Sequence, residues 1–142
     1  MKFSIVLVTL LATVTTAAKL TQSQAETRLK AAGITATSSG GCTNRNVNEE
    51  TVQGAITLKR ACGCEVTVTG GTETGHASGT YSHWNGYKFD FRKGSGIDAY
   101  VKNTFTKIAN RGDGYPQWKA ASGNIYCDEG NHWDVTFYTN GG

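Results

Sequence analysis

Two short segments of this 142-residue chain hold side chains that can bind a metal ion and move a proton. In the first, a histidine, His83, precedes a carboxylate, Asp90, by seven residues. In the second, Glu129 precedes His132 by three residues. A catalytic zinc ion takes three protein ligands of nitrogen and oxygen type and keeps a fourth position for water. We predict that His83, Asp90 and His132 supply these three ligands.

Glu129 is then the candidate general base. It would lie beside the metal without binding it, where a carboxylate can take a proton from the metal's water molecule. Zinc lowers the pKa of such a water to about 7, so hydroxide becomes available at neutral pH. The four residues together predict a zinc-dependent hydrolase.

This pattern resembles that of the M15 class of zinc peptidases, which includes D-alanyl-D-alanine peptidases and phage L-alanyl-D-glutamate endolysins. The resemblance covers roughly residues 66–137 and leaves the first helix and the Cys42 loop unmatched. It implies an α+β fold, peptidoglycan peptides as substrate, zinc ligands at His83, Asp90 and His132, and a base at Glu129. The protein would be a minimal, secreted member that hydrolyses bacterial cell walls, which suits an antimicrobial role.

The chain departs from the family pattern in two ways. Asp90 and Glu129 are closer in sequence than in the family. Family members also carry an arginine on the turn before the first ligand, where it is thought to polarise the scissile carbonyl. Here residues 69–73 contain Glu73 instead. A developing oxyanion needs a donor or a cation, which leaves His76 or the zinc ion alone for that role.

The segment from Gly70 to Gly86 holds five glycines and is predicted to be a long loop. Loops of this length inside a compact domain are usually functional or mobile. His76 in this loop is a candidate substrate contact or fourth ligand, and a three-histidine site with His83 and His132 is an alternative. Tyr81 and Trp84 are candidate exposed aromatics that would stack on sugar rings.

Two other functions stay open. Glu73 with Asp90 or Glu129 could form the carboxylate pair of a glycosidase, which would make the protein a muramidase-like lysozyme. The chain could also be a secreted, non-enzymatic binding module that keeps a metal site for stability. Asp128 or Asp134 could take the role of Glu129 or of His132.

Hydrophobic periodicity and capping signals predict the elements that position these residues. Three helices are expected: from Ser23, in a capping box with Glu26, to Gly33; over 48–61, stopped by Gly63; and over 97–108. Four strands are expected over 65–69, 87–91, 124–127 and 133–138, the last two as a hairpin. This order predicts a single catalytic α+β domain over residues 19–142, DD-peptidase-like, with helices on a small, mostly antiparallel sheet.

The N-terminus has the features of a secretory signal peptide over residues 1–18. Lys2 is followed by an apolar run over residues 3–14, and cleavage is expected near Ala17 or Ala18. Without Lys2 the chain has 13 Lys+Arg against 11 Asp+Glu, a net charge of +2. That value does not favour nucleic acid, and no later segment is predicted to span a membrane. We expect an extracellular monomer whose partner is bacterial peptidoglycan.

Four cysteines remain, and export favours disulfides between them. Cys62 and Cys64 are expected to be too close to bridge each other. The pairing is then Cys42–Cys62 with Cys64–Cys127, or Cys42–Cys64 with Cys62–Cys127. Either pairing would staple the early helical region to the strand next to Glu129. A four-cysteine zinc site is less favoured, because only one C-x-C pair is present.

Overall fold

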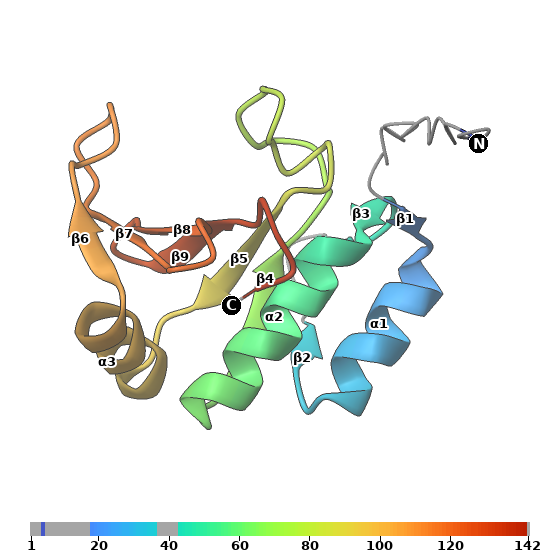
Figure 1. Ribbon diagram of the computed structural model, residues 1–142, viewed down its shortest axis with the longest axis horizontal. Helices are drawn as coiled ribbons and strands as arrows, with labels where there is room; N and C mark the ends of the chain where they lie inside the picture. Colours follow the sequence, from blue (N-terminus) through green and yellow to red (C-terminus); the bar gives the residue numbers. More distant parts are fainter. Residues whose placement is uncertain (1–3, 5–17, 37–42, 142) are drawn as a thin grey trace.

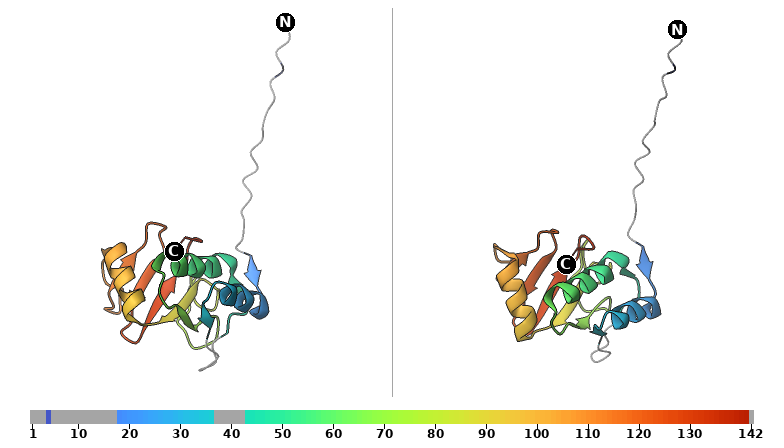
Figure 2. Two further views of the ribbon diagram at one scale, coloured as in Figure 1. Left: turned by 90° about the horizontal axis from the view of Figure 1, so that it is seen from below. Right: turned by 60° about the horizontal axis from the view of Figure 1, so that its bottom comes forward.

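The computed structural model describes residues 4, 18–36 and 43–141 of the chain. These residues form an α+β fold in which three helices pack on a seven-stranded sheet (Figure 1). The helices are α1 (Gln22–Ala31), α2 (Glu49–Cys62) and α3 (Ser95–Thr104). They follow one another from the β2 end of the sheet to the β6 end (Figure 2). The predicted α+β class and the mostly antiparallel sheet are confirmed.

The sheet has the strand order β2-β4-β5-β9-β8-β7-β6, and only the pair β2–β4 is parallel. Its strands are β2 (Thr35–Ala36), β4 (Thr67–Gly70), β5 (Lys88–Arg92), β6 (Thr106–Ile108), β7 (Gln117–Lys119), β8 (Ile125–Asp128) and β9 (His132–Thr136). Two further strands, β1 (Lys19–Leu20) and β3 (Val47–Asn48), form a separate antiparallel ribbon. Both strands of the predicted hairpin are present as β8 and β9.

The register of the strands gives the sheet one apolar and one polar face, because successive side chains point to opposite sides. One row of paired residues crosses β5, β9, β8 and β7 as Phe89, Val135, Tyr126 and Trp118. These side chains join the buried residues of all three helices in one hydrophobic core. The neighbouring row is Asp90, Asp134, Cys127 and Gln117. The polar row therefore lies on the face away from the core.

Two helix boundaries differ from prediction. The capping box of α1 is formed by Thr21 and Gln24 rather than by Ser23 and Glu26, because Thr21 has the extended backbone that an N-cap needs. The third helix ends at Thr104 instead of continuing to Ile108. Phe105 is extended and packs on Tyr126, which directs the chain into β6. Helical spacing alone did not reveal this edge strand.

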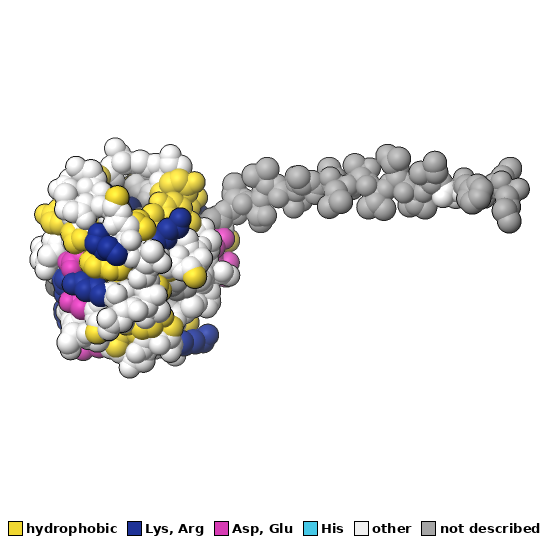
Figure 3. Space-filling model, turned by 60° about the vertical axis from the view of Figure 1, so that its left-hand side comes forward, with side chains coloured by type: hydrophobic (Ala, Val, Ile, Leu, Met, Phe, Trp, Pro, Cys, Tyr) yellow, Lys and Arg dark blue, Asp and Glu magenta, His cyan; other side chains and the backbone are white. Residues whose placement is uncertain are grey.

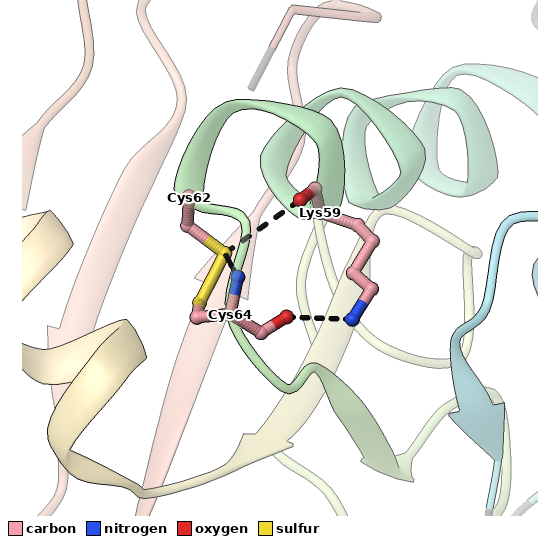
Figure 4. The surroundings of a disulfide bond; sticks show 3 residues. All are labelled: Lys59, Cys62 and Cys64. Atoms are coloured by element: carbon pink, nitrogen blue, oxygen red, sulfur yellow. Dashed lines mark hydrogen bonds between the residues drawn. A yellow bond between two sulfur atoms is a disulfide. The ribbon is translucent and has the colours of Figure 1, made fainter.

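The predicted disulfide pairing is wrong where the structure describes it. Cys62 and Cys64 bridge each other, with Cα atoms 5.1 Å apart (Figure 4). The helix-ending Gly63 is left-handed, with φ of 56°, and this turn brings the two cysteines within bridging distance. Cys127 is a free, buried thiol. No bridge therefore ties the helical region to the strand before Glu129 through this cysteine, and Cys42 lies outside the described residues.

Lysine side chains cover the edge of the core near β6 and α3. On this side of the molecule, basic side chains lie among hydrophobic and acidic ones (Figure 3). The Nζ atoms of Lys102 and Lys107 lie 5.5 and 5.3 Å from the ring centroid of Trp118.

None of the described helices has the length and apolar content of a membrane span. The predicted signal segment lies outside the described residues except for residues 4 and 18.

Gly54 of α2 gives a test of the helix-to-sheet packing. A Cβ atom at this position would overlap the ring of Phe137, a core residue. We expect Gly54→Ala to lower the free energy of unfolding by about 1–3 kcal/mol through overpacking, although alanine normally stabilises a helix interior. Urea unfolding measures the change. Gly94→Ala is the control, since its Cβ would meet nothing within 4 Å; a stabilised Gly54→Ala variant would contradict the packing.

Candidate metal centre

A cavity of about 630 Å³ lies over the polar face of the sheet. Its floor comes from β5, β9 and β8, and its walls come from the β4–β5 and β6–β7 loops. Both loops project from the same end of the sheet (Figure 1). The cavity is lined by side chains of both charges together with histidines, among them His76, His83, Asp90, Arg111, Glu129 and His132. The polar row of the sheet thus becomes the base of a pocket.

Two histidines converge on one oxygen of Asp90. Nε2 of His83 lies 3.2 Å from Asp90 Oδ1, and Nε2 of His132 lies 3.6 Å from the same atom. Ligand atoms about 2.1 Å from a tetrahedral zinc ion are about 3.4 Å from one another. Both separations from Asp90 are close to this value, but His132 is not in the group of described residues whose ligand atoms all lie within 4.8 Å of one another.

Both imidazole rings have their other nitrogen occupied. His83 Nδ1 donates to the carbonyl oxygen of Gly71 at 2.9 Å, and His132 Nδ1 donates to Asn131 Oδ1 at 2.6 Å. A hydrogen bond at one ring nitrogen fixes the tautomer and the ring orientation of a metal-binding histidine. In both residues it leaves Nε2 facing Asp90.

Two buried carboxylate oxygens at this place accept no hydrogen bond: Asp90 Oδ1 and Asp134 Oδ1. Both residues are 7 % exposed. Buried polar atoms are normally satisfied, so an orphaned oxygen calls for a partner such as an ion. Asp134 Oδ1 also lies 3.3 Å from His83 Nε2. Imidazole nitrogens with carboxylate oxygens are a donor set that a divalent metal ion fits.

His76 forms a second grouping around Asp90. Ligand atoms of His76, His83 and Asp90 all lie within 4.8 Å of one another, so these three could hold a metal ion. The His76 ring stacks on His83 with ring centroids 3.7 Å apart, and its Nδ1 is 4.0 Å from Asp90 Oδ2. His76 and His132 therefore approach different oxygens of Asp90, and each is a candidate third ligand.

Electrostatics hold His83 as a cation when no metal is bound. Burial opposes its charge, but the close approach of the Asp134 and Asp90 carboxylates outweighs burial and raises the pKa of His83 to about 9. Burial likewise opposes the charge of Asp134, yet its close contacts with His83 and Lys88 bring the pKa of Asp134 well below its usual value. A metal ion at Asp90 would take the place of the His83 proton.

The two predicted catalytic carboxylates have different positions. Glu129 lies at the centre, with Oε2 3.1 Å from His132 Nε2. Glu73 does not line the main cavity. Both of its oxygens accept from the backbone N–H of Gly71, at 2.9 and 2.8 Å, and its Oε1 is 3.6 Å from His76 Nε2. The structure therefore places Glu73 behind His76.

The predicted substrate contacts are also separated. His76 and Tyr81 line the main cavity, and Tyr81 is 48 % exposed. Trp84 is the most exposed large hydrophobic side chain of the described residues, but it lines neighbouring hollows instead. Asp128 accepts from Lys93 at 2.6 Å and does not line the cavity, so it lies apart from the centre.

Sequence reasoning missed Arg111 and underrated Asp134. Asp134 follows His132 by two residues on β9, so strand alternation could have placed both on one face. Arg111 lies beyond the expected third helix, and no sequence signal linked it to the metal centre. It donates to Asp134 at 2.8 Å and to Glu129 at 2.9 Å.

No protein-family model, curated protein sequence or solved structure matches this chain.

The raised pKa of His83 predicts how the metal-free protein responds to pH. The charged ring stabilises the fold fully below pH 6.5, and this contribution is lost as pH rises through about 9. With chelator present, the free energy of unfolding should fall across this range by an amount on the order of 3 kcal/mol. Urea unfolding at several pH values measures the slope.

The control for this prediction is His83→Gln, which removes the titrating ring from between Asp90 and Asp134. We expect its unfolding free energy to lose most of the decline between pH 6.5 and 9. An equal decline in the variant would show that another group causes it.

Proposed function

We propose that this chain is a secreted, zinc-dependent peptidase that cleaves the peptide stems of bacterial peptidoglycan. The observation that carries the proposal is the approach of His83 Nε2 and His132 Nε2 to a single buried oxygen of Asp90, with Glu129 next to His132. His83, Asp90 and His132 would hold the zinc ion. Bound zinc supplies Lewis-acid activation of water and of the scissile carbonyl.

The chain's own contribution is proton transfer and orientation. Glu129 Oε2 is the oxygen of the base that Arg111 does not bind, since Oε1 accepts from Arg111; it lies 3.1 Å from His132 Nε2. It would take a proton from water as the water oxygen attacks the carbonyl carbon, and return it to the nitrogen as the peptide C–N bond breaks. Gly71 and Asn131 keep the imidazole rings turned toward Asp90 throughout.

The substrate class and the location rest on other observations. Peptidoglycan peptides are proposed because the spacing of His83 to Asp90 and of Glu129 to His132 is similar to that of M15 peptidases, although Asp90 and Glu129 are closer in sequence than in that family. A cavity of about 630 Å³ with Tyr81 and Tyr138 on its lining is of the size of ligand-binding pockets. Export rests on the signal-like segment 1–18, and the Cys62–Cys64 bridge is compatible with an oxidising compartment.

The muramidase alternative has less support. A glycosidase needs two carboxyl groups facing the same sugar. Glu73 is outside the main cavity, and both of its oxygens are bound to the backbone of Gly71. We therefore keep this function only as an outcome of the product analysis below.

Zinc titration tests the ligand set. We expect His83→Ala and Asp90→Asn to weaken zinc binding at least about 100-fold, since even residues that only support metal ligands cost 10- to 100-fold. Competition against a chromophoric chelator measures the affinity. Asp128→Asn is the matched control, because this buried aspartate binds lysines apart from the cavity, and it should bind zinc as the wild type does.

The same titration separates the two candidates for the third ligand. The proposal predicts that His132→Ala loses zinc affinity and that His76→Ala keeps most of it. The reverse result would assign zinc to His76, His83 and Asp90. Glu129 would then have no zinc-bound water to deprotonate.

Mass spectrometry of products released from purified peptidoglycan tests the reaction. We expect free peptides or amino acids, lost on chelation and restored by zinc. Glu129→Gln should bind zinc normally but turn over at least about 100-fold more slowly, the usual contribution of a general base. Chelator-resistant release of muropeptides with new reducing ends would indicate a glycosidase. A folded, zinc-binding protein that releases nothing would be a binding module.

A further inference from the structure

Arg111 bridges two carboxylates of the candidate metal centre. Its Nη1 donates to Asp134 Oδ2 at 2.8 Å, and its Nη2 donates to Glu129 Oε1 at 2.9 Å. Glu129 lies in the turn between β8 and β9 and Asp134 lies on β9, so the guanidinium links the turn to the strand that follows it. The rigid fork of an arginine suits such two-point binding, which a lysine cannot reproduce.

The β6–β7 loop is shaped to present this guanidinium. The Arg111 backbone N–H donates to the Tyr115 carbonyl at 2.8 Å, and the Gly114 N–H donates to the Arg111 carbonyl at 2.7 Å. Asp113 accepts from Nε and Nη2 of Arg111 on the outer side. The guanidinium carbon lies 5.7 Å from the Tyr115 ring centroid. The side chain is therefore held on both sides before it reaches the cavity.

The bridge determines which oxygen of each carboxylate faces a histidine. Glu129 Oε1 is taken by Arg111, so Oε2 is the oxygen that faces His132. Asp134 Oδ2 accepts from both Arg111 and Lys88, which leaves Oδ1 facing His83. Without Arg111 the Glu129 carboxylate would keep only its contact with His132 and could rotate.

Arg111 also balances charge. Three carboxylates, of Asp90, Glu129 and Asp134, meet at the centre with side chains 10, 21 and 8 % exposed. Lys88 and Arg111 are the permanent cations bonded to them. A positive charge beside a metal site opposes the binding of a divalent cation, because like charges repel. Removing Arg111 should therefore strengthen metal binding while it disorders the base.

We infer that Arg111 is a positioning residue, which fixes the Glu129 carboxylate as a general base and limits the metal affinity of the centre. The effect on turnover rests on the proposed peptidase function. The effect on metal affinity rests only on the charges and contacts of the centre.

The test compares Arg111→Met and Arg111→Lys with the wild type. For Arg111→Met we expect a zinc dissociation constant about three- to tenfold lower and a kcat about 100-fold lower with KM little changed. Arg111→Lys keeps the charge but not the two-point bridge. It should retain wild-type zinc affinity and lose about tenfold in kcat. Arg60→Met, an exposed arginine on α2, is the control and should change neither value.

The outcomes separate the two hypotheses. If the wild type binds zinc but releases no peptide, the proposed function fails, while the zinc affinities still test the charge balance. If Arg111→Met binds zinc more weakly than the wild type at an unchanged melting temperature, or turns over as fast as the wild type, the inference is overturned. Should Arg111→Met fold poorly, Asp113→Asn loosens the same guanidinium from the exposed side. It should lower kcat by a smaller factor, and an unchanged kcat would contradict the positioning role of Arg111.

Discussion

The pairing of β5 with β9 is the constraint on which the rest of the centre depends. Their antiparallel register sets Asp90 opposite Asp134 and Arg92 opposite His132. The partners of an antiparallel pair point to the same face, so Asp90, His132 and Asp134 must share one side of the sheet. A slip of one residue in either strand would turn the polar side chains of that strand into the core. The core prevents this slip, because Phe89, Phe91, Trp133 and Val135 alternate with the polar residues and are fully buried.

Placing two aspartates side by side creates a second constraint, since buried like charges repel and lose hydration. The chain meets it with cations from three separate segments: His83 from the β4–β5 loop, Lys88 from β5 and Arg111 from the β6–β7 loop. Space is also limited. A Cβ atom at Gly70, the β4 neighbour of Asp90, would lie 2.5 Å from Asp90 Oδ2. Glycine there lets the carboxylate lie against the next strand and face His76 and His83.

The strands and the loops of the centre supply different side chains. The strands supply Asp90, His132 and Asp134 and fix their spacing through the register. The β4–β5 loop supplies His76 and His83, and the backbone of Gly71 holds the His83 ring. Exposed tyrosines, Tyr81 and Tyr138, contact each other edge to face at 4.8 Å beside the cavity.

Local sequence determined much of this protein. Alternation predicted β5 and the β8–β9 hairpin, and helical spacing with Gly63 predicted α2, because these patterns arise from residues close together in the chain. The spacing of His83 and Asp90, with Glu129 and His132 downstream, selected four residues that the fold brings together. Two-residue strands such as β2 carry too few residues for a pattern, and β6 was hidden in a helical one.

Only the tertiary structure decided the rest. The turn at Gly63 placed Cys62 and Cys64 within bridging distance. Their closeness in sequence had predicted that they would not form a disulfide with each other. The strand order brought Arg111 to Glu129 across 18 residues, and the path of the β4–β5 loop set Glu73 behind His76. These contacts depend on how distant segments pack. Sequence spacing therefore selected the candidate ligands and the candidate base, whereas the packing of loops on the sheet determined the charges that surround them.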